Sequence, residues 1–182
     1  MALWLNLIGY QLAWLITVAG AGAGRSWPAW SAAAVLCGGH LLFSSHRARD
    51  LRLMGLAALL GSLLDGSLAS SGLLHYSPAA PAVPVTGCPL WITALWIAFS
   101  TTLTRSLGWL RQRIATSLLF GAIGGPLAYW AAERGWGVIV FATPRWQGLI
   151  ALGTGWAIAL ALLVLVAGNR PDVRSPEPQA LR

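Results

Sequence analysis

The sequence predicts an all-α integral membrane protein, a bundle of six transmembrane helices with the N-terminus and the C-terminus both in the cytoplasm. Of the 182 residues, 57% are hydrophobic and only 9% are charged, whereas about a quarter of a soluble domain is charged. So few charges could not cover a water-exposed surface, and most of the chain should therefore face lipid or other helices. The apolar stretches and the distribution of arginine support the same fold.

Six apolar stretches approach the length of about 20 residues that a helix needs to cross a bilayer. They cover residues of about 3–22, 27–43, 53–74, 90–110, 114–132 and 148–168. We expect residues 1–168 to form one transmembrane domain. Residues 169–182 are polar and contain three prolines and three arginines, which predicts a disordered cytoplasmic tail. The first span should be retained, because no Lys or Arg precedes it as in a signal peptide.

Arginine supplies all twelve Lys and Arg residues, and its distribution predicts the orientation. Cytoplasmic loops of membrane proteins are enriched in basic residues. With the N-terminus inside, nine arginines would be cytoplasmic and three external. The nine are Arg47, Arg49, Arg52, Arg105, Arg111, Arg113, Arg170, Arg174 and Arg182, and the three are Arg25, Arg134 and Arg145. Membrane topology thus explains the net charge of +7, and we do not expect nucleic-acid binding.

Two connecting segments and one helix carry further signals. Residues 76–89 contain four prolines and no charge, which predicts an extended surface loop. Residues 133–147 should lie at the membrane interface because they contain two tryptophans, a residue favoured there. Gly121 and Gly125 have the spacing that lets two helices approach closely. They could serve a partner helix or a second copy of the chain.

Asp65 is the strongest single candidate for a functional residue. It lies 13 residues after Arg52 and 10 before His75, so we expect it near the bilayer midplane, where a carboxylate costs about 2.5–3.5 kcal/mol. It must therefore be neutral, paired, or exposed to a water-filled cavity. Ser62, one turn earlier on the same helix face, could donate a hydrogen bond to it. The alternative is a structural aspartate that fixes helix packing.

Other polar residues should lie at or below this depth, in the cytoplasmic half of the bundle. Arg105, for example, is six residues before Arg111, or about 9 Å inside the end of the fourth span. We therefore predict a polar pocket that opens to the cytoplasm and has Asp65 as its floor. Its candidate ligand-binding residues are Asp65, Arg105, His40, Gln11, Asn6, Thr101 and Trp96. Alternatively, Arg105 extends to the lipid headgroups, and Trp96, one of eleven tryptophans, only fills the core.

The sequence contains no phosphate-binding glycine loop, no H-E-x-x-H and no G-x-S-x-G motif. Such motifs would indicate an enzyme class. Cys37 and Cys88 have no metal-ligand spacing, and their different depths disfavour a disulfide, which needs Cα atoms within about 7 Å. We expect no metal and no cofactor, and no catalytic residue can be assigned.

One long motif carries a resemblance. The run Pro89-x-Trp91-Ile92-x-x-Leu95-Trp96-x-x-Phe99-x-x-Thr102-Leu103-x-x-Ser106-Leu107-x-Trp109-Leu110, with Gly124-Gly125-Pro126-Leu127-Ala128-Tyr129 downstream, resembles a bacterial membrane family, domain-of-unknown-function family 2878. The likeness extends to Asn6, Gln11 and Trp14 and covers nearly all the spans. It implies a multi-pass protein of the bacterial inner membrane and brings no activity or site residues.

Three functions stay open. The first is a protein that binds or carries a small molecule or a lipid in the polar pocket that opens to the cytoplasm. Membrane lipids would surround such a protein. The second is a structural or partner-binding membrane subunit that uses Gly121 and Gly125. The third, the least favoured, is a membrane-embedded enzyme for a lipid-like substrate, with Asp65 or His40 as the acid–base group and Arg105 holding an anion.

Overall fold

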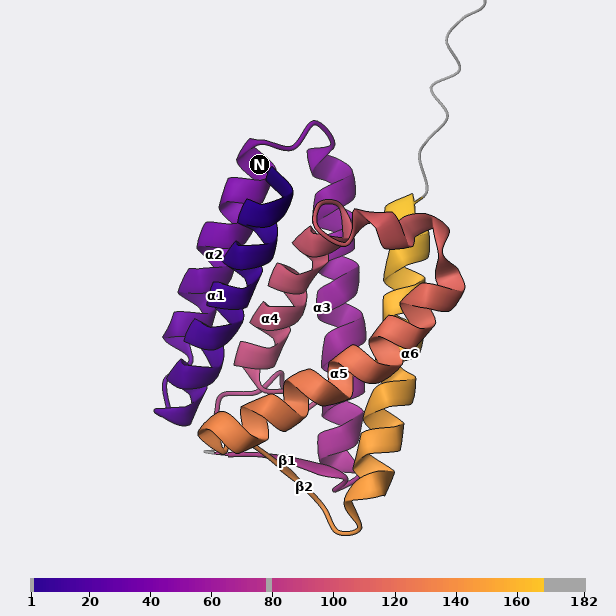
Figure 1. The fold of residues 1–182 in the computed structure, drawn as a ribbon. Helices are drawn as coiled ribbons and strands as arrows, with labels where there is room; N and C mark the ends of the chain where they lie inside the picture. The colour runs from indigo at the N-terminus through magenta and orange to yellow at the C-terminus, as the bar shows by residue number, and fades with distance from the viewer. Residues whose placement is uncertain (1, 78–79, 169–182) are drawn as a thin grey trace, which may run out of the picture.

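The computed structural model describes residues 2–77 and 80–168 (Figure 1). This part of the chain is helical apart from a small two-stranded antiparallel sheet, which confirms the all-α prediction. The helices are α1 (Ala2–Gly22), α2 (Trp27–Leu42), α3 (Arg47–Ser70), α4 (Leu90–Leu103), α5 (Ile114–Trp136) and α6 (Arg145–Gly168), with a short 3-10 helix η1 (Gly108–Gln112) and strands β1 (Leu74–Tyr76) and β2 (Ile139–Phe141). The predicted tail, residues 169–182, lies outside the described residues.

Four of the described helices are long and apolar enough to cross a membrane, namely α1, α3, α5 and α6. Helix α4 is apolar but has 14 residues, and α2 has 16. The chain thus has the helices of a membrane protein.

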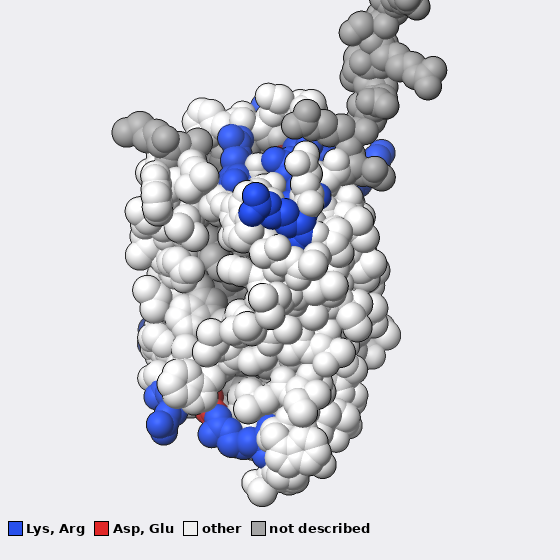
Figure 2. All heavy atoms as spheres, turned by 45° about the vertical axis from the view of Figure 1, so that its right-hand side comes forward, with Lys and Arg blue, Asp and Glu red and all other residues white. Residues whose placement is uncertain are grey.

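Successive helices alternate in direction and create two distinct ends (Figure 1). One end holds the start of α1, the α2–α3 turn, η1 and the end of α6; we call it the arginine-rich end. Its described arginines are Arg47, Arg49, Arg52, Arg105, Arg111 and Arg113. The other, the sheet end, holds the α1–α2 turn, both strands, Arg25, Arg134 and Arg145. Figure 2 shows the arginines at the two ends and a largely uncharged belt between them.

Helices α3 and α4 differ most from the predicted bounds, while α5 ends at Trp136 and not near residue 132, and α6 begins at Arg145 and not near residue 148. The helix expected over residues 53–74 begins at Arg47 and ends at Ser70. Leu74–Tyr76 instead forms β1, which pairs with β2 in the segment expected at the interface. The helix expected over residues 90–110 ends at Leu103. The hydroxyls of Thr101 and Thr102 accompany this early end, because each donates to the carbonyl three residues earlier, a contact that bends helices.

The proline-rich segment was expected to be an extended surface loop, and its described part is more compact. Cys88 and Pro89 are buried, and backbone hydrogen bonds join Val83 to Cys88 and Leu90 to Pro81. A Cβ atom on Gly66 of α3 would lie 2.2 Å from the Thr86 carbonyl oxygen. The end of this loop therefore packs directly on α3.

Small residues let the helices approach large aromatic side chains. A Cβ on Gly121 would lie 2.6 Å from the Trp156 carbonyl oxygen, and one on Gly125 would lie 2.4 Å from Trp156 Cγ. The close approach predicted for these glycines thus occurs with α6 of the same chain, and a contact with a second chain stays a prediction. Trp156 in turn stacks on Trp96, with ring centroids 4.1 Å apart. Helix α5 runs obliquely across this core (Figure 1).

We expect Gly121→Ala to lower the free energy of unfolding by about 1–3 kcal/mol, because the new methyl group would overlap the rigid backbone of α6. Gly55→Ala is the matched control, because a Cβ there has no neighbour within 4 Å. The control should be neutral or stabilising by up to about 1 kcal/mol. Unfolding of both variants in detergent measures the difference, and equal stability would contradict the packing described.

Candidate ligand-binding site

Asp65 is fully buried and accepts three hydrogen bonds from three different elements. Its Oδ1 accepts from the Tyr76 hydroxyl of β1 at 2.5 Å and from the Tyr129 hydroxyl of α5. Its Oδ2 accepts from Trp96 Nε1 of α4 at 2.8 Å. Ser62, the predicted donor, instead shares a 3.0 Å hydrogen bond with Thr93. We call Asp65, Tyr76, Trp96 and Tyr129 the Asp65 cluster.

The Asp65 cluster lies toward the sheet end of the bundle. Asp65 is five residues before the end of α3, or about 7.5 Å along the helix, and Tyr76 belongs to the sheet itself. Burial and the neighbouring Asp65 carboxylate raise the pKa of Tyr76 well above its ordinary value, so the hydroxyl keeps its proton and stays a donor. Asp65 lines none of the cavities found in the described part of the chain.

A second polar layer lies near the arginine-rich end, where α1 meets the end of α4. Asn6 donates through Nδ2 to Thr101 Oγ1 at 3.2 Å. Its Oδ1 accepts from the Ser106 hydroxyl at 2.7 Å and from the Ser106 backbone at 3.4 Å. The amide of Asn6 is thus satisfied on both sides, which is the usual condition of a buried polar group.

In the same layer α2 contacts the first turn of α3 through a buried pair. Nε2 of His40 lies 2.9 Å from Asp50 Oδ2. Ser44 also donates to Asp50, at 2.5 Å, and Arg49 contacts Oδ1 at 3.2 Å. The Thr104 hydroxyl lies 3.4 Å from the same His40 nitrogen. A catalytic relay needs the carboxylate and the hydroxyl on opposite ring nitrogens, so this arrangement is not one.

A groove of about 300 Å³ opens beside this layer, between α1, α2 and the turn after α4. We call it the head groove. It is lined by Leu5, Asn6, Val35, Leu36, Gly39, His40, Phe43 and Arg105. One guanidinium nitrogen of Arg105 donates to the Phe43 carbonyl at 3.0 Å, which holds the side chain across the groove. His40 Nδ1 makes no hydrogen bond with the described residues and can serve a ligand.

The structure therefore divides the seven predicted site residues. Asn6, His40 and Arg105 meet in the head groove, and the buried Thr101 supports Asn6 from behind. Gln11 lines a separate cavity between α1 and α5. Asp65 and Trp96 belong to the Asp65 cluster and do not line the head groove, so Asp65 is not the floor of that groove. A ligand-binding role for any of the seven stays a prediction.

Sequence reasoning missed four residues of these networks. Asp50 falls between the predicted spans 27–43 and 53–74, whereas it lies in the first turn of α3. Ser106 lies beyond the regular part of α4, where its direction depends on the turn. Tyr76 and Tyr129 were not predicted as donors, although Tyr129 belongs to the motif that carries the resemblance, because a tyrosine hydroxyl reaches a partner that only the tertiary fold provides. Among the described residues no group of three or more His, Cys, Asp or Glu could hold a metal ion.

Residues 3–162, which include both polar layers and the head groove, match one protein family described as "Protein of unknown function (DUF2878)". The chain belongs to the DUF2878 family. This confirms the resemblance noted in the sequence. No curated protein and no solved structure matches the chain significantly. The function of this DUF2878 protein must therefore be argued from its own geometry.

The three tyrosines offer a test of the Asp65 cluster. We expect Tyr76→Phe and Tyr129→Phe each to lower the free energy of unfolding by about 1.5–3 kcal/mol, the usual contribution of a hydrogen bond to a charged group. Tyr10→Phe is the matched control, because its hydroxyl has no hydrogen bond with the described residues; it should cost less than about 0.5 kcal/mol. Unfolding in detergent measures all three.

Asp65→Asn, combined with Tyr76→Phe, gives a double-mutant cycle. Asn can accept from Trp96 Nε1 through its oxygen and donate from its nitrogen to the two tyrosine hydroxyls, which also accept. Hydrogen bonds to a carboxylate are thereby replaced by weaker neutral ones, so this change should also be destabilising. Tyr76→Phe should cost less in the Asp65→Asn background than alone. Additive losses would show that Tyr76 does not act through Asp65.

Proposed function

We propose that this protein binds or carries an anionic lipid or lipid-like small molecule in the head groove, and that it does so in the bacterial inner membrane. The charged head of the ligand lies against Arg105, His40 and Asn6. Its chain follows the cleft between α1 and α2. The proposed site is polar and faces the cytoplasm, as the sequence predicts, but it does not include Asp65.

One observation carries the proposal: the head groove continues into an apolar trough. The trough has a volume of about 440 Å³ and lies between α1 and α2 toward the sheet end. It shares Val35 and Leu36 with the head groove, and its other lining residues are Gly9, Leu12, Ala13, Ile16, Trp27, Pro28, Ser31 and Ala32. The polar head groove and the uncharged trough that continues it match the polar and apolar halves of an amphiphile.

The charges favour an anion. One guanidinium nitrogen of Arg105 donates to the Phe43 carbonyl, and the other N–H groups remain available to a ligand. Asp50, the nearby carboxylate, is already engaged by His40 and Arg49, so it opposes an anion less than a free carboxylate would. A guanidinium matches phosphate or carboxylate oxygens in geometry and charge.

The proposed orientation puts the arginine-rich end in the cytoplasm. Six of the described arginines gather there, against three at the sheet end, in agreement with the positive-inside tendency. With α2 and α4 also counted as spans, six helices cross the membrane and both termini are cytoplasmic. At about 1.5 Å per residue, the 16 residues of α2 cover about 24 Å, so local thinning of the bilayer would accompany this arrangement.

A structural or partner-binding role is the second candidate. The observation in its favour is the Asp65 cluster, whose carboxylate is fully satisfied inside the protein. Catalysis has less support, because His40 meets Asp50 and Thr104 through one and the same nitrogen.

Reporter fusions test the orientation. Fusions after Asp50, after Gly108 and at the C-terminus should report a cytoplasmic location. Fusions after Pro81 and Pro144 should report an external one. A C-terminus outside the cell would contradict the proposed six spans.

Lipid retention tests the site. In nanodiscs of mixed phosphatidylglycerol and phosphatidylcholine, native mass spectrometry should show preferential retention of the anionic lipid. Arg105→Gln should reduce this preference about tenfold or more, because it removes a charge-assisted contact of about 1.5–3 kcal/mol. Arg113→Gln is the control, since Arg113 is exposed at the same end and lies over Trp109, outside the groove.

A steric pair completes the test. Gly39 lines the head groove and its neighbour Gly38 does not, and a Cβ at either position has no neighbour within 4 Å. Gly39→Leu should therefore obstruct retention of the anionic lipid, whereas Gly38→Leu should leave it unchanged. Wild-type retention by both Arg105→Gln and Gly39→Leu would reject the head groove as the site.

A further inference from the structure

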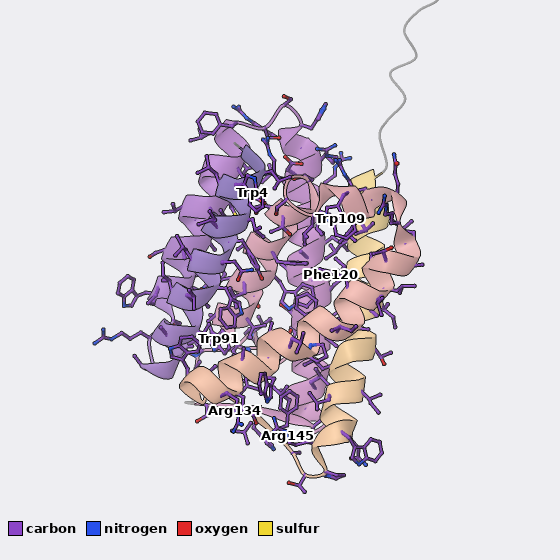
Figure 3. All side chains as sticks on the ribbon, in the orientation of Figure 1. Trp4, Trp91, Trp109, Phe120, Arg134 and Arg145 are labelled. Atoms are coloured by element: carbon purple, nitrogen blue, oxygen red, sulfur yellow. The ribbon has the colours of Figure 1, made fainter. Side chains whose placement is uncertain are left out.

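A second cavity, separate from the head groove, lies on the opposite side of α1. It has a volume of about 410 Å³, is partly open at the surface and is lined by α1, α4, α5 and α6. We call it the aromatic chamber, because its walls include Tyr10, Trp14, Phe99, Phe120 and Trp156. Phe120 projects into it from α5 (Figure 3).

Helical geometry makes the two sites independent. Tyr10, Gln11 and Trp14 line the aromatic chamber, whereas Gly9, Leu12, Ala13 and Ile16 line the trough. At 100° per residue these two sets lie on opposite faces of α1. A ligand in one site therefore does not need the other.

The chamber exists because α5 has glycines, which lack a side chain, where it faces α1. The space beside Gly121 and Gly125 is occupied by the backbone and ring of Trp156 on α6. The space beside Gly124 is not occupied in this way, because a Cβ there would meet only the Phe120 ring, at an ordinary contact distance of 3.7 Å. The space beside Gly124 is therefore open to a larger group.

The chamber contains polar groups but no charge. No Asp, Glu, Lys, Arg or His is among the described residues that line it. The Tyr10 hydroxyl and the Gln11 amide make no hydrogen bond with the described residues, and neither is among the fully buried polar atoms that lack a partner. These two groups therefore remain available to a ligand, and a donor without a partner in an apolar site favours a ligand that supplies an acceptor.

We infer that the aromatic chamber binds a neutral, largely apolar molecule that carries a carbonyl oxygen. The apolar part of the ligand packs between the aromatic rings, and the carbonyl accepts a hydrogen bond from the Tyr10 hydroxyl or the Gln11 amide. A charged ligand would find no counter-ion there, and burial of an unpaired charge is unfavourable. Such a carbonyl can come from a flat ring molecule that diffuses in the membrane or from the ester of a glycerolipid.

Matched probe pairs test this. For the ring source, 2-methyl-1,4-naphthoquinone is compared with 2-methylnaphthalene, by equilibrium dialysis of the detergent-solubilised protein with empty micelles subtracted. For the lipid source, ester-linked phosphatidylcholine is compared with its ether-linked analogue by native mass spectrometry. We expect the wild-type protein to prefer the carbonyl member of at least one pair, and the pair that shows the preference identifies the source.

Two variants connect the preference to the chamber. Gly124→Leu fills the space beside Phe120 and should reduce binding of the preferred probe at least tenfold without lowering the melting temperature. Gly135→Leu, on the same helix and outside the chamber, should bind as the wild type does. Tyr10→Phe should reduce carbonyl binding about 3- to 10-fold, as the loss of one hydrogen bond predicts, and leave the carbonyl-free analogue unchanged.

The inference is overturned if neither pair shows a carbonyl preference, or if Gly124→Leu binds the preferred probe as well as the wild type does. Retention of phosphatidylglycerol by the same Gly124→Leu protein reports on the head groove separately. It should be unchanged, so failure at one site is distinguished from failure at the other.

Discussion

The fold depends on a carboxylate that has been taken out of water. Burial of an ionised group costs several kcal/mol unless the surrounding structure replaces its hydration. Here Asp65 of α3 is surrounded by donors from β1, α4 and α5. Each donor must arrive in the right place for the carboxylate to be tolerated, so one residue constrains the relative positions of four elements. In lipid the hydrophobic effect does not distinguish helix packing from lipid contact, and this polar constraint is correspondingly more important.

The aromatic core transmits that constraint to the rest of the bundle. Trp96 donates to Asp65 with its indole nitrogen and stacks on Trp156 with its ring. Trp156 occupies the space left by Gly125 on α5. Gly61 on α3 makes room for Trp96 in the same way, because a Cβ there would lie 2.1 Å from the ring. This series of contacts, from Asp65 through Trp96 and Trp156 to Gly125, fixes α5 against α6, whereas α5 meets α1 near its end through Trp136 and Trp14.

The sequence predicted the helices well, because apolar stretches and arginine-rich turns reflect a one-dimensional property of the chain. It did not predict the position of Asp65 within its helix. The helix expected over residues 53–74 begins at Arg47 and ends at Ser70. Asp65 therefore lies toward the sheet end of α3, away from His40 and Arg105. The tyrosine donors could not be predicted, because they belong to other elements than Asp65, and Tyr76 lies in a strand whose pairing with β2 the sequence did not predict.

The two polar layers differ in what they leave free. Around Asp65 every donor is used, and Asp65 itself lines no cavity found in the described residues, which is the arrangement of a structural element. Near the arginine-rich end, His40 is held through one ring nitrogen by Asp50 and Thr104, and Arg105 is held by the Phe43 carbonyl. Both still present further donor or acceptor atoms to a groove. Polar groups that are fixed by one bond and free at another are suited to ligands, because the ordering entropy has already been spent. Function is therefore better sought at the arginine-rich end and along the two faces of α1 than at the most deeply buried charge.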